Sequence, residues 1–184
     1  MGAASASMFQ TKKCKVRFWL LSVISPILPD LDVIAFAFGI PYAHFFGHRG
    51  FFHSIPFAFM LAVLTVLIFF RSSYFSALQR AGLTLYFFIL NASHGLLDAL
   101  TSGGLGIALF SPFSDERIFF TFRPIKVSPI GISAFFSEWG LRVIKSEMFW
   151  VWLPLGMLYV IIKLSLYFIE RLNALESNSP LERG

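Results

Sequence analysis

Histidine and aspartate side chains gather in three short motifs that lie far apart in the sequence. The motifs are LPDLD at 28–32, FGHRGFFHS at 46–54 and SHGLLDALT at 93–101. Neutral imidazole and carboxylate groups are ligands that zinc, manganese and iron accept in proteins. The pattern predicts a site for one or two divalent cations, with zinc favoured and manganese or iron as alternatives. The candidate metal ligands are Asp30, Asp32, His48, His53, His94 and Asp98.

The third motif has the spacing of a helical ligand pair. His94 and Asp98 are four residues apart, so they lie one turn apart on the same face of a helix. Ionisable groups near membrane depth are costly and usually mark a functional site. Asp30 and Asp32 are also candidate catalytic groups, one as a ligand and the other as an orienting carboxylate, or both as ligands. Arg49 is the third candidate catalytic residue, because its charge would offset that of a phosphate.

Structural roles compete with these chemical ones. Asp30 and Asp32 stand beside a proline and could cap a helix or form an Asx turn. His48 could be an exposed loop residue, and His53 precedes an apolar run and could lie at an interface. His44 stands in an aromatic stretch, where we expect an interfacial position rather than a ligand.

The composition indicates that these motifs lie in a membrane protein. Of the 184 residues, 57% are hydrophobic and 14% charged, and the mean hydropathy is +0.72. Soluble domains are about 45–50% apolar and about 25% charged. The net charge is +5, but the basic residues are dispersed, so we expect no nucleic-acid partner. Cys14 is the only cysteine, which excludes an intrachain disulfide and a CxxC metal site.

The hydropathy pattern predicts an all-α, polytopic membrane protein with about four transmembrane helices in a single domain over 1–184. A helix needs about 20 mostly apolar residues to cross the hydrocarbon core. Residues 31–47 are too broken by Gly39 and Pro41 to span and are expected to be re-entrant or interfacial. Residues 132–145 have the pattern of an amphipathic interfacial helix within an extramembrane segment, 101–147. The candidate spans are 16–28, 54–70, 81–100 and 148–169, followed by a polar tail at 171–184.

The distribution of basic residues predicts the orientation. Lysine and arginine are enriched in cytoplasmic loops, and four crossings with both termini inside satisfy that bias. The three motifs then meet on the extracytoplasmic face. The apolar run after the N-terminal lysines resembles a signal peptide, but no small-residue cleavage pattern follows, so we expect an uncleaved anchor.

The ordered set of motifs resembles the YdjM-type family. The resemblance runs from about Leu20 to beyond Gly131, and includes SPFSDER at 111–117 and RPIKVSPIG at 123–131. Members are described as LexA-regulated proteins of the inner membrane with a proposed metal-dependent hydrolase activity. The resemblance implies a bacterial inner-membrane location and a His/Asp metal site. Matched to this chain, the implied ligands are Asp30 or Asp32, His48, His53, His94 and Asp98.

Two positions depart from the family pattern. Phe52 stands where members commonly have a threonine, beside the candidate ligand His53. Members usually begin with a helix that carries a Thr-His pair, whereas no histidine precedes His44 here. Because residues 1–7 resemble the end of that helix, we expect a misassigned or truncated start, with a further histidine encoded upstream.

These observations predict a metal-dependent membrane hydrolase that uses metal-activated water on a lipid or amphiphilic phosphoester. The His-x-x-x-Asp pair also resembles zinc phospholipase C and P1-type nucleases, which suggests phosphoester chemistry by analogy. The main alternative is a metal-binding or ion- or proton-transporting membrane protein without hydrolytic activity. A third is an assembly factor in which the metal is structural. The expected partners are the lipid bilayer and the substrate, and the oligomeric state is open.

Overall fold

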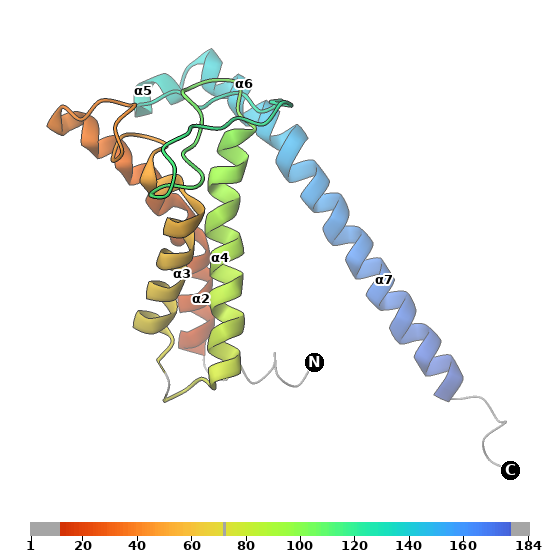
Figure 1. Cartoon of the computed structure of the whole chain (residues 1–184). Helices are drawn as coiled ribbons and strands as arrows, with labels where there is room; N and C mark the ends of the chain where they lie inside the picture. Colours follow the sequence, from red (N-terminus) through yellow and green to blue (C-terminus); the bar gives the residue numbers. More distant parts are fainter. Residues whose placement is uncertain (1–11, 72, 178–184) are drawn as a thin grey trace, which may run out of the picture. The chain divides into compact units, whose positions relative to one another are not determined.

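The computed structural model describes residues 12–71 and 73–177, and these residues form helices joined by loops (Figure 1). Within that part of the chain no named strand occurs, and one isolated antiparallel bridge joins Ile107 and Ile118. The expected all-α class is confirmed. The chain divides into two compact units, 1–123 and 124–184. The expected N-terminal truncation concerns residues 1–7, which lie outside the described residues.

The first unit contains three long helical segments. The first combines α2 (Lys12–Ile24) with η1 (Ser25–Phe38), the second is α3 (Ile55–Phe69), and the third is α4 (Ala77–Ala99). A short turn of helix, η2 (Phe51–His53), precedes α3. In Figure 1, α2, α3 and α4 lie side by side, and hydrophobic side chains from all three form one core.

The winding of η1 separates its two aspartates. Two prolines, Pro26 and Pro29, lack the N–H donor of a regular helix, and the segment is wound as a 3₁₀ helix with three residues per turn. Asp30 and Asp32 therefore point in different directions: the Asp32 side chain is fully buried, whereas that of Asp30 is 47% exposed. The helix ends at Gly39, whose φ of 73° suits a residue without a side chain.

Serine residues fix the beginnings of α3 and α4. The Ser54 hydroxyl accepts a hydrogen bond from the Phe57 N–H, and a proline occupies the first turn of α3. At the start of α4, Ser76 and Gln79 form a capping box. These caps place His53 immediately before α3, and they leave α4 to continue without interruption to the third motif.

A stripe along α4 packs on the rest of the unit. Its buried residues recur every four positions, so they lie on one face of the helix. The N-terminal residues of the stripe, Leu83 and Phe87, pack with Ala62, Val66 and Phe70 in a hydrophobic core. Beside that core, the Ser25 hydroxyl donates a hydrogen bond to Asn91 Oδ1, and Asn91 Nδ2 lies 3.5 Å from the Ala58 carbonyl. The stripe consists of Leu83, Phe87, Asn91, Gly95 and Ala99.

The loop after α4 is attached to the two other motif segments. The Ala108 N–H donates to the Arg49 carbonyl, and the Ile55 N–H donates to the Leu109 carbonyl. The Phe120 N–H donates to the carbonyl of Ala99 at the end of α4. These bonds hold the second motif, the start of α3 and the end of α4 close together.

The second unit is a long helical run preceded by a short helix. It contains α5 (Ile132–Phe135), α6 (Glu138–Glu147), η3 (Met148–Trp152) and α7 (Leu153–Ser177). The η3 segment has the wider winding of a π-helix and continues directly into α7. The expected interfacial helix over 132–145 is divided, because Ser137 caps α6 by accepting the Trp139 N–H.

Among the described residues, two helical stretches are long and apolar enough to cross a membrane, Cys14–Phe38 and Glu138–Asn173. The first extends well beyond the expected 16–28, because the helix continues through its prolines into the segment expected to be interfacial. The expected span at 54–70 corresponds to α3, a shorter apolar helix of 15 residues. The expected span at 81–100 lies within α4, which begins earlier, at Ala77.

The close contact between α4 and His53 leads to a prediction for Gly95. A Cβ atom at this position would lie 2.5 Å from the backbone carbonyl oxygen of His53. We expect Gly95→Ala to cost about 1–3 kcal/mol through overpacking and to lower Tm by roughly 5 °C. Thermal unfolding of the detergent-purified protein measures this change. Gly82→Ala on the same helix is the control, since a Cβ added there would meet no atom within 4 Å and alanine is the better helix former. Equal melting temperatures for the two variants would contradict the packing described.

Candidate metal centre

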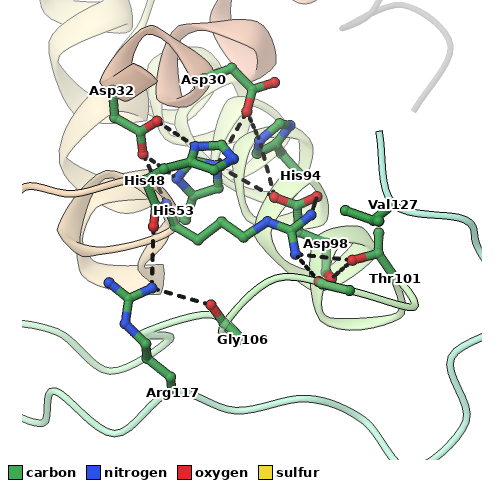
Figure 2. Close-up of polar contacts among 12 residues, drawn as sticks. Asp30, Asp32, His48, His53, His94, Asp98, Thr101, Gly106, Arg117 and Val127 are labelled. Atoms are coloured by element: carbon green, nitrogen blue, oxygen red, sulfur yellow. Dashed lines mark hydrogen bonds and ion pairs between the residues drawn. The ribbon is translucent and has the colours of Figure 1, made fainter. Parts of the chain in front are cut away.

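The histidines and aspartates of the three motifs meet in one cluster of side chains (Figure 2). Asp30 and Asp32 come from η1, and His53 ends η2 just before α3 begins. His94 and Asp98 lie on the last turns of α4. The structure arranges the six predicted ligands in two groups that share His53: Asp30, His53, His94 and Asp98 in the first, and Asp32, His48 and His53 in the second.

In the first group, two imidazole nitrogens face two carboxylate oxygens. His53 Nε2 lies 3.3 Å from Asp30 Oδ1 and 3.4 Å from Asp98 Oδ2. His94 Nε2 lies 3.3 Å and 3.9 Å from the same two oxygens. Ligands at the ~2.0–2.1 Å bond lengths of tetrahedral zinc are about 3.3 Å apart, so the donor atoms have separations that fit one cation.

The hydrogen bonding of His94 also indicates a cation at the first group. Its Nε2 atom is buried and makes no aligned hydrogen bond within the described residues, although Asp30 Oδ1 is only 3.3 Å away. His53 Nδ1 is likewise buried without an aligned hydrogen bond, at 3.0 Å from Asp32 Oδ2. A buried nitrogen without a hydrogen bond is costly. A cation between the His94 nitrogen and the carboxylates would satisfy both. The donor set and its geometry therefore fit a divalent metal ion.

In the second group, the buried carboxylate of Asp32 contacts two imidazoles. Asp32 Oδ1 lies 2.7 Å from His48 Nδ1, and Asp32 Oδ2 lies 3.0 Å from His53 Nδ1. The same Oδ2 accepts a hydrogen bond from the Arg49 backbone N–H at 3.1 Å. Asp32 thus joins η1 to the second motif at three points.

The shared histidine decides which group is the better coordination set. A neutral imidazole has a proton on one nitrogen and a lone pair on the other, so His53 can offer a ligand atom to only one group. With the Nδ1 proton directed to Asp32, the lone pair of Nε2 faces the first group. A carboxylate behind a ligating histidine in this way fixes the tautomer and the orientation of the ring.

The Arg49 guanidinium is directed into the centre. Its side chain is 4% exposed, and Nη2 donates to Asp98 Oδ1 at 2.9 Å. Nη1 donates to the Thr101 hydroxyl and to the Gly103 carbonyl. Arg49 also has a left-handed backbone with φ of 63°, which is unusual for a residue with a side chain. In this position its charge acts on Asp98 and leaves the other oxygen, Oδ2, for the histidines.

The charges of the centre are unbalanced without a cation. The carboxylates of Asp30, Asp32 and Asp98 face one guanidinium, that of Arg49, which leaves two negative charges. Burial lowers the pKa of His53, but its contacts with Asp30 and Asp32 and the charge of Asp98 raise it by more, from 6.5 to about 9. A proton on His53 therefore replaces part of the missing positive charge.

Two residues with structural roles escaped prediction from sequence. Arg117 donates to the carbonyls of Tyr42, His44 and His48, and so holds the loop that carries the second motif. The family motif SPFSDER contains Arg117 and was the available signal. Asn91 joins α4 to Ser25 and had no signal beyond its polarity. His44 lies outside both groups of candidate ligands.

Comparison with known proteins agrees with the resemblance drawn from the motifs. The family described as YdjM inner membrane protein matches residues 1–172. The inner membrane protein YbcI of Escherichia coli (strain K12) is 45% identical over 142 residues, which cover 77% of this chain and 80% of that protein. No solved structure matches. The family prediction is confirmed.

The geometry of the first group predicts the effect of removing its histidines. We expect His53→Ala and His94→Ala to lose most of the bound metal, because each removes one of the four donor atoms that converge. Elemental analysis by mass spectrometry on detergent-purified protein measures the stoichiometry. His44→Ala is the control, and it should keep the wild-type metal content. Metal retained in both site variants, with folding verified by chromatography, would exclude this centre.

The raised pKa of His53 predicts that metal binding depends on pH. Below about pH 9 a cation must displace the His53 proton before Nε2 can bind it. The apparent affinity should therefore rise about tenfold per pH unit between pH 7 and pH 9 and level off above that. Chelator competition at several pH values measures this slope, and calorimetry in two buffers counts the released proton. An affinity that is flat over this range would contradict the assignment of His53.

Proposed function

Because the chain belongs to the YdjM family of inner membrane proteins, we propose that it is a metal-dependent hydrolase of that membrane. Its substrate in this proposal is a phosphoester of a lipid or of another amphiphile. The observation that carries the proposal is the first group of ligands. Two imidazole nitrogens and two carboxylate oxygens from three separate segments converge at 3.3–3.9 Å.

The proposed enzyme crosses the membrane four times. The crossings are α2 with η1, α3, α4, and η3 with α7; two of these stretches have the length and hydropathy of spans. Arg71 and Arg80 stand at the ends of α3 and α4 that are remote from the motifs. With those arginines in the cytoplasm, the metal centre faces the extracytoplasmic side.

The ligands in this proposal are His53, His94 and Asp98, with Asp30 as the exposed fourth member. Catalytic zinc sites use three protein ligands and keep a position open, whereas structural sites are closed by four. Asp30 is the carboxylate that solvent and substrate reach, since its side chain is 47% exposed and that of Asp98 is 19% exposed. We assign Asp30 to accept the proton that the attacking water loses.

The remaining polar groups position the ligands. Asp32 orients His53 through Nδ1, and Arg49 holds Asp98 through Oδ1. A bound divalent ion would act as a Lewis acid and lower the pKa of water towards neutrality. Zinc is the favoured ion because the donor set is imidazole and carboxylate, and one ion is favoured because His53 cannot serve both groups.

Metal binding without hydrolysis is the second candidate, and one observation favours it. All four side chains of the first group lie within ligand distance, which is the number found in closed structural sites. Ion transport has less support. Among the described residues, the polar pair Ser25–Asn91 below the centre is followed by the hydrophobic core around Val66, Phe70 and Phe87.

Asp30→Asn separates the two candidates. In the hydrolase, we expect this variant to keep its metal and to lose about 10²–10⁴-fold in kcat, because an amide cannot accept the proton. His94→Ala should lose both metal and activity, and Asp115→Asn, on an exposed loop, is the control for both. The assay uses liposomes that contain phosphatidylglycerol and, separately, water-soluble phosphomonoesters and phosphodiesters. Wild-type protein with stoichiometric metal and no turnover of any of these substrates would support metal binding alone.

A further inference from the structure

We infer that the residues before and at the start of α3 form an aromatic wedge that inserts into the lipid bilayer beside the metal centre. The partner of this surface is the boundary between headgroups and acyl chains in one leaflet. The inference rests on the proposed crossing by α3 and deepens the proposed function, because it brings the centre to the level of lipid phosphates. The wedge consists of Phe45, Phe46, Phe51, Phe52 and Phe57.

The length of α3 is the first argument. Its 15 residues extend about 22 Å at about 1.5 Å per residue, whereas the hydrocarbon core is about 30 Å thick. The helix ends next to Arg71, and Arg17 Nη1 donates to the Phe69 carbonyl at that end. A charged end favours the interface, so the missing ~8 Å must come from the other end. That end is where the wedge lies.

The contacts among the phenylalanines are the second argument. The rings of Phe45 and Phe51 stack at 5.1 Å, and those of Phe52 and Phe57 meet edge to face at 5.2 Å. Phe46 contacts Phe52 and is 46% exposed. None of the five belongs to the buried hydrophobic core of the described residues. The rings therefore form a cluster of their own, in which Phe46 is exposed and the other four are half-buried.

This surface continues into the exposed face of α3. The large exposed residues of that face are all apolar, and they begin two positions after Phe57. The ionisable side chains within the wedge segment point the other way: His48, Arg49 and His53 are 9% exposed or less. His44 is the exposed exception. The exposed α3 residues are Phe59, Met60, Leu64, Leu67, Ile68 and Phe69.

The hydrogen bonding of the backbone is the third argument. Irregular backbone at membrane depth is tolerated only where its polar groups are satisfied within the protein. Within the loop, the Phe51 N–H donates to the Phe45 carbonyl and the Gly50 N–H to the Gly47 carbonyl. The Arg117 guanidinium supplies the donors that the loop itself lacks, since it reaches the carbonyls of Tyr42, His44 and His48.

The consequence for the proposed function concerns access to the centre. His53 directly follows two rings of the wedge, so the depth of the wedge in the membrane fixes the depth of the ligands. A centre held at the headgroup boundary meets phosphates that already lie in the leaflet. The wedge thus favours a membrane lipid over a water-soluble phosphoester as substrate.

Spin labels on single cysteines test the wedge in proteoliposomes of phosphatidylethanolamine and phosphatidylglycerol. Cys14→Ser removes the only native cysteine, and Phe46→Cys, Leu67→Cys and Tyr74→Cys then each carry one nitroxide. Leu67 is the lipid reference on α3, and Tyr74, which is 86% exposed in the turn before α4, is the water reference. We expect the Phe46 label to collide with oxygen as the Leu67 label does, and with a water-soluble nickel chelate about tenfold less than the Tyr74 label.

Each other outcome overturns the inference in a recognisable way. Nickel collisions at Phe46 equal to those at Tyr74 would place the wedge in water. A label shielded from both reagents would show that protein, such as a second copy of the chain, covers the surface. Nickel collisions at Leu67 equal to those at Tyr74 would exclude the crossing by α3, and with it the wedge. The metal content of each labelled variant reports separately on the metal centre.

Arg117 provides a matched pair of variants. Arg117→Gln removes donors from three loop carbonyls, so the Phe46 label should move towards water and its nickel collisions should rise severalfold. Arg123→Gln is the control, since Arg123 lies over the Phe119 ring at 4.6 Å in the same loop region. Unchanged nickel and oxygen collisions of the Phe46 label in Arg117→Gln would show that the loop keeps its depth in the membrane without the guanidinium, which would contradict the third argument.

Discussion

The buried carboxylate of Asp32 is the contact on which the rest of the centre depends. It joins the first helical segment to the second motif through His48 Nδ1, the Arg49 N–H and His53 Nδ1. A buried charge is tolerated only when it is paired and hydrogen-bonded, and breaking such a pair costs about 3–5 kcal/mol. Asp32 therefore both orders the loop and orients His53. The 3₁₀ winding of η1 makes this arrangement available, because it buries Asp32 while leaving Asp30 accessible.

The three carboxylates of the centre differ in their exposure and in their contacts. Asp32 has no exposed side-chain surface and contacts His48 and His53. Asp98 divides its two oxygens between Arg49 and the imidazoles, which fixes its orientation. Asp30 is the most exposed of the three, and its Oδ1 atom contacts both His53 and His94. A divalent cation would neutralise the two negative charges that remain after Arg49 is counted, and His53 holds a proton in its place when no metal is bound.

The membrane constrains the same residues from outside. The chain is an inner membrane protein by family, and its apolar helices are interrupted where the centre is built. Irregular backbone and ionisable groups are costly in lipid, so both must be enclosed by protein. Arg117 donates hydrogen bonds to the loop carbonyls, including that of Tyr42. Gly95 lets α4 approach the His53 carbonyl without an intervening side chain. The phenylalanines of the proposed wedge belong to the same loop and to the start of α3.

From the amino-acid sequence alone, the helical membrane class, the family and the residues that meet could all be predicted. Hydropathy places the first motif after the first apolar segment, the second motif before the second segment and the third motif at the end of the third segment. The four-residue spacing of His94 and Asp98 places these two side chains on one helical face. Sequence also indicated that the carboxylates and imidazoles would gather. It did not predict how they divide into two groups, or which of the three aspartates pairs with the Arg49 guanidinium. Those features depend on contacts between segments, such as the bond from Arg117 to the Tyr42 carbonyl, 75 residues away. The helix bounds also differed, since the first helix continues past the expected end at residue 28 as the 3₁₀ segment η1 and ends only at Gly39. Local periodicity specifies which face a side chain occupies, but only the packed structure decides which partner that face meets.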